Sequence, residues 1–128
     1  MNANARESLN ALFEAVVGAS YEVSNTLGTG FLEKVYERAL IKELALRGIS
    51  ARPQVPYHVT YKGHIIGEYI ADLVVDDRLL VELKCVNALA KDHLAQCINY
   101  LRASHLSLAL LVNFQHSKVG WLRVVSGL

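Results

Sequence analysis

Two acids, Asp72 and Glu82, have types and spacing that could together hold a cation, and a lysine, Lys84, follows close after the second acid. Both acids fall in short stretches rich in aliphatic and β-branched residues, and such composition predicts β-strands. Glu82 and Lys84 are two positions apart, so they point to the same face of their strand. Their apolar neighbours, Val81 and Leu83, point to the other face. The pattern therefore predicts charged groups gathered on one face of a sheet.

The turn between the two strands decides which residues lie opposite each other. Residues 76–78, Asp-Asp-Arg, are typical of a tight turn. If Val75 and Leu79 close this turn, Asp72 lies directly opposite Glu82. Like charges in such a position destabilise a sheet, so a cation between them is expected, and carboxylate oxygens suit Mg²⁺ or Mn²⁺. The alternative is a strand that alternates between apolar and polar faces, with its charged side chains in water.

A third acid comes from a predicted helix that begins near residue 32 and ends at Gly48. At about 100° per residue, Glu33 and Glu37 border the apolar stripe that faces the core. The basic residues of this helix occupy the opposite, exposed arc: Lys34, Arg38 and Lys42. A buried carboxylate requires a partner or a metal, so Glu33 is a candidate third ligand. The alternative is a carboxylate at the rim that pairs with Arg47 or with the helix dipole.

A later predicted helix, residues 88–102, has a polar face of its own. Gln96 and Tyr100 are one turn apart, near His93. They lie on the side away from the apolar residues of this helix, which are Leu94, Cys97, Ile98 and Leu101. Taken alone, this face would be the solvated side of a helix. It becomes a candidate part of a site only in combination with the acids.

The elements that must position these residues follow one another without repeats or linkers. Two helices are expected first, at about 5–27 and 32–48, separated by a stop at Leu27-Gly28-Thr29-Gly30. Pro53 and Pro56 are expected in a short connection. The remaining elements are expected in this order: strands 57–61, 65–75 and 79–85, helix 88–102, and strands 106–114 and 119–125. The result is an α/β arrangement in which the third helix crosses over to a strand of the same sheet.

Length and composition limit the remaining possibilities. The chain has 128 residues, of which 52% are hydrophobic, and a formal net charge of +1, so one folded domain is expected. No apolar stretch is long enough to span a membrane, and no export signal is visible. Cys85 and Cys97 are too few for a disulfide framework, so reduced thiols in a cytoplasm are expected. The balanced charge also means that any contact with nucleic acid must come from a local patch.

Four motifs in order resemble a known family. Gly30, Glu33 and Tyr36 read G-x-x-E-x-x-Y, which is the signature of the bacterial GxxExxY proteins, a branch of the PD-(D/E)XK nuclease-like superfamily. Asp72 matches the aspartate of the superfamily motif, and Glu82-Leu83-Lys84 matches its E-x-K. Gln96 and Tyr100 match its Q-x-x-x-Y helix motif. The resemblance extends over about residues 27–125, and Ala71 stands where the name of the motif has proline.

The resemblance implies a restriction-endonuclease-like fold. Its α-β-β-β-α-β core would contain a mixed central sheet flanked by helices, with an extra helix at the N-terminus. The whole chain, 1–128, would form one domain, in which residues 1–27 are the N-terminal helix and residues 28–125 are the core that carries the motifs.

The resemblance also implies roles for the motif residues. Asp72, Glu82 and Glu33 would bind Mg²⁺ or Mn²⁺, and Lys84 would hold or activate the attacking water. Gln96 would orient the water or the lysine. The other tyrosine of the motifs, Tyr100, would brace its helix against the site.

The predicted function is that of a metal-dependent nuclease that hydrolyses phosphodiester bonds of nucleic acid, with DNA as the expected form. The alternative is a catalytically silent module of the same fold that binds protein or nucleic acid, and a third is a plain structural domain. Intact Asp72, Glu82 and Lys84 favour the enzyme, because an inactive site has no reason to hold like charges together. The absence of a DNA-reading element favours the module. We also expect a homodimer, because one small domain offers little surface to a polymer.

Overall fold

The structure of the chain is a computed structural model that describes residues 1–126. It contains these elements: α1 (Ala3–Leu27), α2 (Glu33–Leu46), β1 (Ala51–Tyr61), β2 (His64–Val75), β3 (Leu79–Lys84), α3 (Lys91–Ser104), β4 (Leu108–Asn113) and β5 (Gly120–Val125). The order is the predicted α-α-β-β-β-α-β-β, and the α/β class is confirmed.

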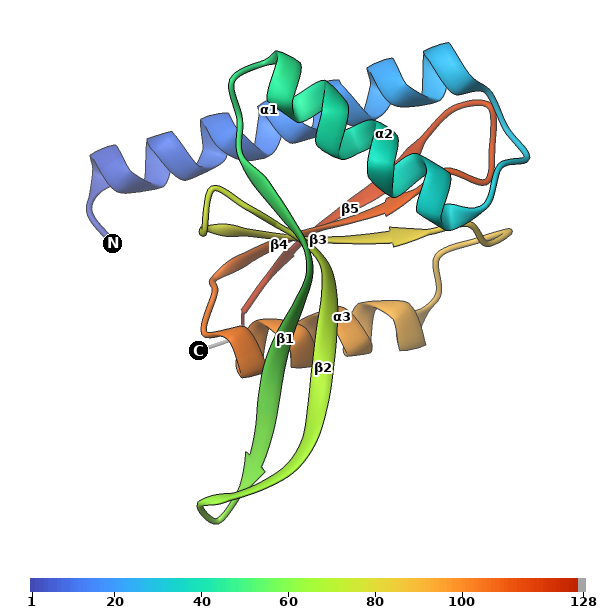
Figure 1. Cartoon of the computed structure of the whole chain (residues 1–128). Coiled ribbons are helices and arrows are strands. Elements are labelled where there is room, and N and C mark those ends of the chain that lie inside the picture. The colour runs from blue at the N-terminus through green and yellow to red at the C-terminus, as the bar shows by residue number, and fades with distance from the viewer. Residues whose placement is uncertain (127–128) are drawn as a thin grey trace.

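The five strands form one mixed sheet in the order β1-β2-β3-β4-β5. β3 and β4 are parallel, while the other neighbours are antiparallel. Parallel neighbours require a long connection, and α3 supplies it by crossing over between them. α1 and α2 cover one face of the sheet and α3 covers the other (Figure 1). The crossover predicted from the sequence is therefore confirmed.

Two hydrophobic cores lie on the two faces of the sheet. The first core joins α1 and α2 to the sheet and includes Val81 and Leu83. The second core joins α3 to the opposite face and includes Leu80. Because side chains alternate along β3, Glu82 lies on the same face as Leu80. The predicted division of β3 into an apolar face and a face that carries charge is confirmed.

The two prolines lie inside β1 and not in a connection, so that part of the prediction is wrong. Pro53 is paired with Leu73 and Pro56 with Ile70, and β1 begins at Ala51, six residues earlier than predicted. Proline has no backbone N–H and disrupts a central strand, but an edge strand tolerates it. β1 is an edge strand of this sheet.

The far halves of β1 and β2, residues 57–70, project from the body as a two-stranded arm (Figure 1). β2 pairs with β3 over Leu73–Val75, so the arm depends on the pairing of β1 with β2. Its tip is the predicted turn at Lys62-Gly63, where both residues have positive φ, 48° and 81°. The sheet thus divides into a five-stranded body and a ribbon that extends beyond it.

Candidate functional site

Asp72 and Glu82 lie opposite each other where β2 and β3 separate. The last paired residues are Leu73 and Val81. Beyond them, the Asp72 N–H donates to Oε1 of Glu82 at 3.2 Å, and the Leu83 N–H donates to Oδ2 of Asp72 at 2.8 Å. The two carboxyl groups therefore accept hydrogen bonds from the backbone of the facing strands. The register predicted from the turn is confirmed.

The electrostatic state of this pair is unusual. The Glu82 residue is 3% exposed. Burial first, and then the negative charge of Asp72, raise the pKa of Glu82 to about 9. Burial also raises the pKa of Asp72, although the hydrogen bond from the Leu83 N–H works against the rise. A buried and a half-buried carboxyl group this close retain a proton at neutral pH unless a cation takes its place.

The donor set of this pair suits a hard divalent cation. The backbone uses one oxygen of each carboxyl group, and the second oxygen of each remains for the proton or for a cation. Mg²⁺ is commonly held by one or two carboxylates, with water and substrate phosphates as its other ligands. Within residues 1–126, no group of three or more His, Cys, Asp or Glu side chains is arranged to hold a metal ion. Asp72 and Glu82 fit a Mg²⁺ or Mn²⁺ site of the kind that a phosphate completes.

Glu33 stands beside this pair, in the first turn of α2. Its pKa is raised by burial and then by the negative charge of Asp72, while the positive charge of Lys84 lowers it. Glu33 is therefore within electrostatic reach of both residues. The alternative prediction that Glu33 pairs with Arg47 is wrong, because Arg47 Nε lies 2.8 Å from Oε2 of Glu43.

Glu37, one turn further along α2, is the more deeply buried acid of this helix, at 5% exposed. Lys34 Nζ lies 2.9 Å from Oε2 of Glu37, and Gln54 Nε2 donates to Oε1 at 3.0 Å. Both of its oxygens thus have partners within the chain. Glu37 also raises the pKa of Asp72, so it contributes negative charge to the surroundings of the site.

Gln54 is a residue of this region that the sequence did not indicate. Its neighbours in β1, Pro53 and Val55, pair with Leu73 and Ala71, which places Gln54 beside Asp72 on the next strand. Gln54 has a φ of 52°, a left-handed conformation that non-glycine residues rarely adopt. Such strain persists where the surroundings hold it, and here the amide is bound to Glu37. The flanking prolines had suggested a loop, which hid this position.

Lys84 and Gln96 are in contact, with 3.5 Å between Nζ and Oε1. Tyr100 is half-buried in the second core, and it does not lie on a solvated face. Burial, followed by the negative charges of Glu82 and Asp72, raises the pKa of Tyr100 to about 12. The structure therefore brings both residues of the helix motif to the acids and the lysine.

The G-x-x-E-x-x-Y motif has a mechanical basis. The Tyr36 hydroxyl donates to the Gly28 carbonyl at 2.6 Å and accepts from the Phe31 N–H at 3.4 Å. Its ring stacks on Phe114 with 4.8 Å between centroids. Gly30 has a φ of 100°, which glycine adopts without strain. Tyr36 thus holds the loop from which α2 begins, and this loop places Glu33 beside Asp72.

Asn113 is a second positioning residue that the sequence did not indicate. It is 4% exposed, and its amide makes two hydrogen bonds to Val86: the Val86 N–H donates to Oδ1 at 3.1 Å, and Nδ2 donates to the carbonyl at 2.9 Å. The Phe114 N–H also donates to the Lys84 carbonyl at 2.9 Å. The segment after Lys84 is thereby fixed to the end of β4. An asparagine at the end of an apolar strand was the available signal.

The mixed sheet and the acids at its split define an α/β protein with a two-carboxylate site between strands. Residues 10–124 match the family model of the PD-(D/E)XK nuclease superfamily, and the chain belongs to this superfamily. The resemblance is thus confirmed at the level of the superfamily. No curated protein matches the sequence.

A solved structure, described as the crystal structure of SSO0001, is similar to this chain with a TM-score of 0.59 and 16% sequence identity. The similarity covers 74% of this chain and 50% of that one, so this chain spans half the length of that protein. It shows a common fold. In the part of the chain that the structure describes, no helix is long and apolar enough to cross a membrane.

Proposed function

We propose that this chain is a metal-dependent nuclease that hydrolyses phosphodiester bonds, with DNA as its substrate. The observation that carries the proposal is the pair of half-buried Asp72 and buried Glu82, in which the pKa of Glu82 is raised to about 9. Two desolvated acids destabilise a sheet unless a proton or a cation compensates for them, and such groups are typical of functional sites. Membership of a nuclease superfamily supports the same reading.

The residues of the site have distinct proposed roles. A Mg²⁺ or Mn²⁺ ion, when bound, would neutralise charge on the phosphate and lower the pKa of the attacking water. Asp72 and Glu82 would hold this ion. Glu33 is not arranged with them as a three-residue metal site, so as a further ligand it would have to turn towards the bound ion. Lys84 carries positive charge beside the acids and would position the attacking water and the phosphate.

Two residues of α3 would support that lysine. Gln96 lies 3.5 Å from Lys84 Nζ and would keep the ammonium group in place. Tyr100 would brace α3 against the site, since its ring is packed in the second core. Both are positioning roles, because neither side chain is needed to hold the ion.

The test is cleavage by the purified protein with increasing Mg²⁺ or Mn²⁺. Single-stranded, double-stranded and branched DNA, and RNA, serve as substrates. Wild type and Glu14→Ala, a control at an exposed position of α1, should cut DNA, and Glu82→Ala should not. A wild type that cuts none of these substrates would favour the silent interaction module. Equal cleavage by Glu82→Ala would remove the support for the site.

A homodimer is part of the proposal. The arm exposes large apolar side chains: Tyr61, Ile65, Ile66 and Ile70. A two-stranded ribbon with apolar surface and unpaired edges favours pairing with another chain, and a second copy offers the same surface. Ile66→Glu should lower the apparent mass in sedimentation velocity to that of a monomer. A wild type that sediments as a monomer at micromolar concentration contradicts the dimer.

A cytoplasmic location and membership of the bacterial GxxExxY branch complete the proposal. Cys85 and Cys97 are free thiols, which a reducing compartment maintains. The contacts of Tyr36 give the motif of that branch a structural purpose. Fractionation of cells that express the tagged protein tests its location.

A further inference from the structure

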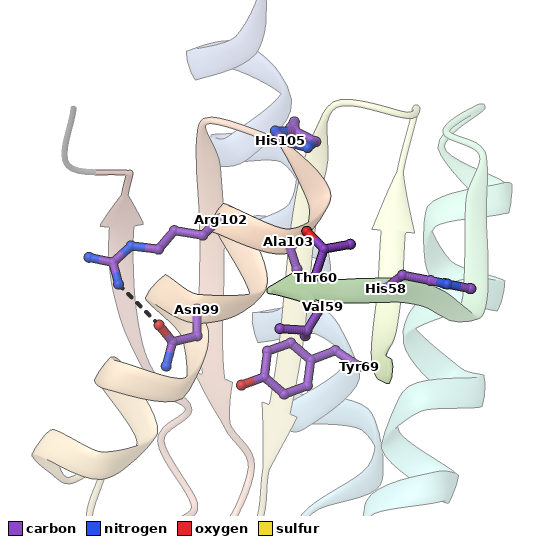
Figure 2. A pocket seen from close by; sticks show the side chains of 8 residues that line it. All are labelled: His58, Val59, Thr60, Tyr69, Asn99, Arg102, Ala103 and His105. Atoms are coloured by element: carbon purple, nitrogen blue, oxygen red, sulfur yellow. Dashed lines mark hydrogen bonds between the residues drawn. The ribbon is translucent and has the colours of Figure 1, made fainter. Parts of the chain in front are cut away.

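A groove of about 400 Å³ lies between the arm and α3 (Figure 2). On the side of the arm it is lined by Val59, Thr60 and Tyr69, and on the side of α3 by Asn99, Arg102 and Ala103. This volume is within the range of ligand sites in proteins. No role in the chemistry of the acids has been given to any of these six residues.

One wall of the groove continues the helix face that touches the lysine of the site. Gln96, Asn99 and Ala103 are three and four residues apart, so they share one face of α3. Gln96 contacts Lys84, while Asn99 and Ala103 line the groove. Seven residues of helix span about 10 Å. The groove therefore begins about one helical turn from Gln96, at Asn99, and extends to about two turns from it, at Ala103.

The other wall is also joined to the site. Tyr69 projects from the arm towards Asn99 (Figure 2). Its ring packs edge-to-face on Tyr100, with 4.5 Å between centroids. Burial, followed by the negative charges of Glu82 and Asp72, raises the pKa of Tyr100, so this ring is within electrostatic reach of the acids. A molecule in the groove that contacts Tyr69 is thus separated from the acids of the site by the ring of Tyr100.

The lining combines an aromatic ring, neutral hydrogen-bonding groups and positive charge. None of the eight lining residues is acidic. Arg102 is exposed at the outer side of α3, where it donates to Oδ1 of Asn99 at 3.3 Å (Figure 2). Among residues 1–126, no carboxylate lies within ion-pair distance of this guanidinium. Its charge therefore remains for an anion such as a phosphate.

We propose that the groove binds a short stretch of single-stranded nucleic acid beside the phosphate that is cut, an inference that rests on the proposed nuclease function. Tyr69 can stack only on an unpaired base, because a duplex covers the faces of its bases. The span of about 10 Å from Gln96 to Ala103 leaves room for a short run of nucleotides only. Arg102 neutralises a phosphate at the outer end. The site thus acts on unpaired strands, or on the unpaired part of a branched substrate.

Binding without metal tests this inference independently of cleavage. Fluorescein-labelled oligo-dT and oligo-rU of about 12 nucleotides, and a blunt duplex of the same length, are titrated with the full chain in EDTA, and anisotropy is measured. The wild type should bind the single strands more tightly than the duplex. Comparison of oligo-dT with oligo-rU distinguishes DNA from RNA.

Asn99→Asp is the main variant, since it adds a negative charge to the groove without a change of shape. Like charges facing each other weaken binding strongly, so the affinity for oligo-dT should fall about tenfold or more. Asn25→Asp, at an exposed position of α1 on the other face of the sheet, carries the same charge change and should bind as the wild type does. Arg102→Ala should lower the slope of log affinity against log salt by about 0.7, the value for one phosphate contact of a single strand.

Ala103→Trp fills the groove and should weaken binding by a different route, with circular dichroism as the check on folding. Equal affinities of Asn99→Asp and Asn25→Asp, or tighter binding to the duplex, overturn the inference. If the protein cuts nucleic acid but shows either result, the proposed nuclease function stands and the proposed role of the groove is rejected. If the protein binds single strands in a manner that depends on Asn99 but cuts nothing, the proposed role of the groove stands and the nuclease function is rejected.

Discussion

The two faces of the sheet use the same strands in opposite ways. Towards α1 and α2, β3 presents Val81 and Leu83, and both are completely buried in the first core. Towards α3, the same strand presents Leu80, then Glu82 and Lys84. The first face is a continuous apolar surface, whereas the second changes from apolar to charged within one strand.

This difference shows how a small domain can carry a charged site without losing its stability. Alternation along β3 lets each face be changed independently of the other. The first core supplies apolar burial, which dominates folding free energy. The second face carries the energetic cost of buried Glu82 and half-buried Asp72. Substitutions on the two faces should therefore affect different properties, stability on one and activity on the other.

The largest expected effect is the loss of activity on the charged face. Lys84→Ala and Glu82→Ala should each lower hydrolysis at least about a thousandfold. They should differ in metal binding, because Glu82→Ala removes a proposed ligand and Lys84→Ala does not. Isothermal titration with Mn²⁺ measures this difference. Loss of Mn²⁺ binding in both variants, or in neither, contradicts the assigned roles.

The second effect is on stability and belongs to the apolar face. Leu83→Ala should lower the free energy of unfolding by about 2–5 kcal/mol, because it leaves a cavity in the first core. Denaturant unfolding measures this loss. Glu82→Gln, the neighbouring change on the charged face, should instead leave the metal-free protein as stable or more stable at pH 8, because it removes a buried acid. A larger loss of stability in Glu82→Gln than in Leu83→Ala would contradict the assignment of stability to the apolar face.

The third effect is the pH dependence of the charged face. The pKa of Glu82 is raised from 4.5 to about 9 in the folded chain, so the folded state keeps a proton that the unfolded state releases. Below 4.5 both states hold the proton, and the free energy of unfolding should fall as the pH rises towards 9. The fall is at most about 1.4 kcal/mol per pH unit.

Unfolding at a series of pH values in EDTA measures this slope. Glu82→Gln should flatten it, and Mg²⁺ should restore stability to the wild type at the alkaline end, because a bound cation replaces the proton. A metal-free stability that rises between pH 5 and pH 8 would show that Glu82 is ionised in the folded chain.

The smallest effect concerns the loop that places Glu33. Tyr36→Phe keeps the stack on Phe114 and removes the hydrogen bond to the Gly28 carbonyl. It should lower the free energy of unfolding by about 1 kcal/mol and reduce activity without abolishing it. Thermal unfolding and a cleavage assay on the same sample measure both. Full activity with reduced stability would show that the loop has no part in the site.

Local sequence patterns predicted most of the helices and strands, and the pairing of the two acids at the site. The turn at residues 76–78 was sufficient to place Asp72 opposite Glu82, because a short turn leaves one register for its strands. Alternation placed Glu82 and Lys84 on one face. Helical periodicity predicted the ends of α1, α2 and α3 to within a few residues.

The same patterns could not reveal features that depend on distant segments. Pro53 and Pro56 belong to a strand because β1 lies at the edge of the sheet, and strand order is a property of the whole chain. Gln54 and Asn113 act through partners on other elements, at Glu37 and Val86.

Glu33 and Glu37 border the same stripe of one helix, and their different fates illustrate this limit. Periodicity assigned both to the rim of the core and singled out Glu33. Packing of α2 against the sheet then buried Glu37 between Lys34 and Gln54. It left Glu33 exposed on its solvent side and only partly desolvated beside Asp72. Residue type and spacing determine which faces an element has, because these follow from backbone geometry alone. Which of these faces meets a partner, and therefore which carboxylate is desolvated, depends on contacts between segments far apart in the chain.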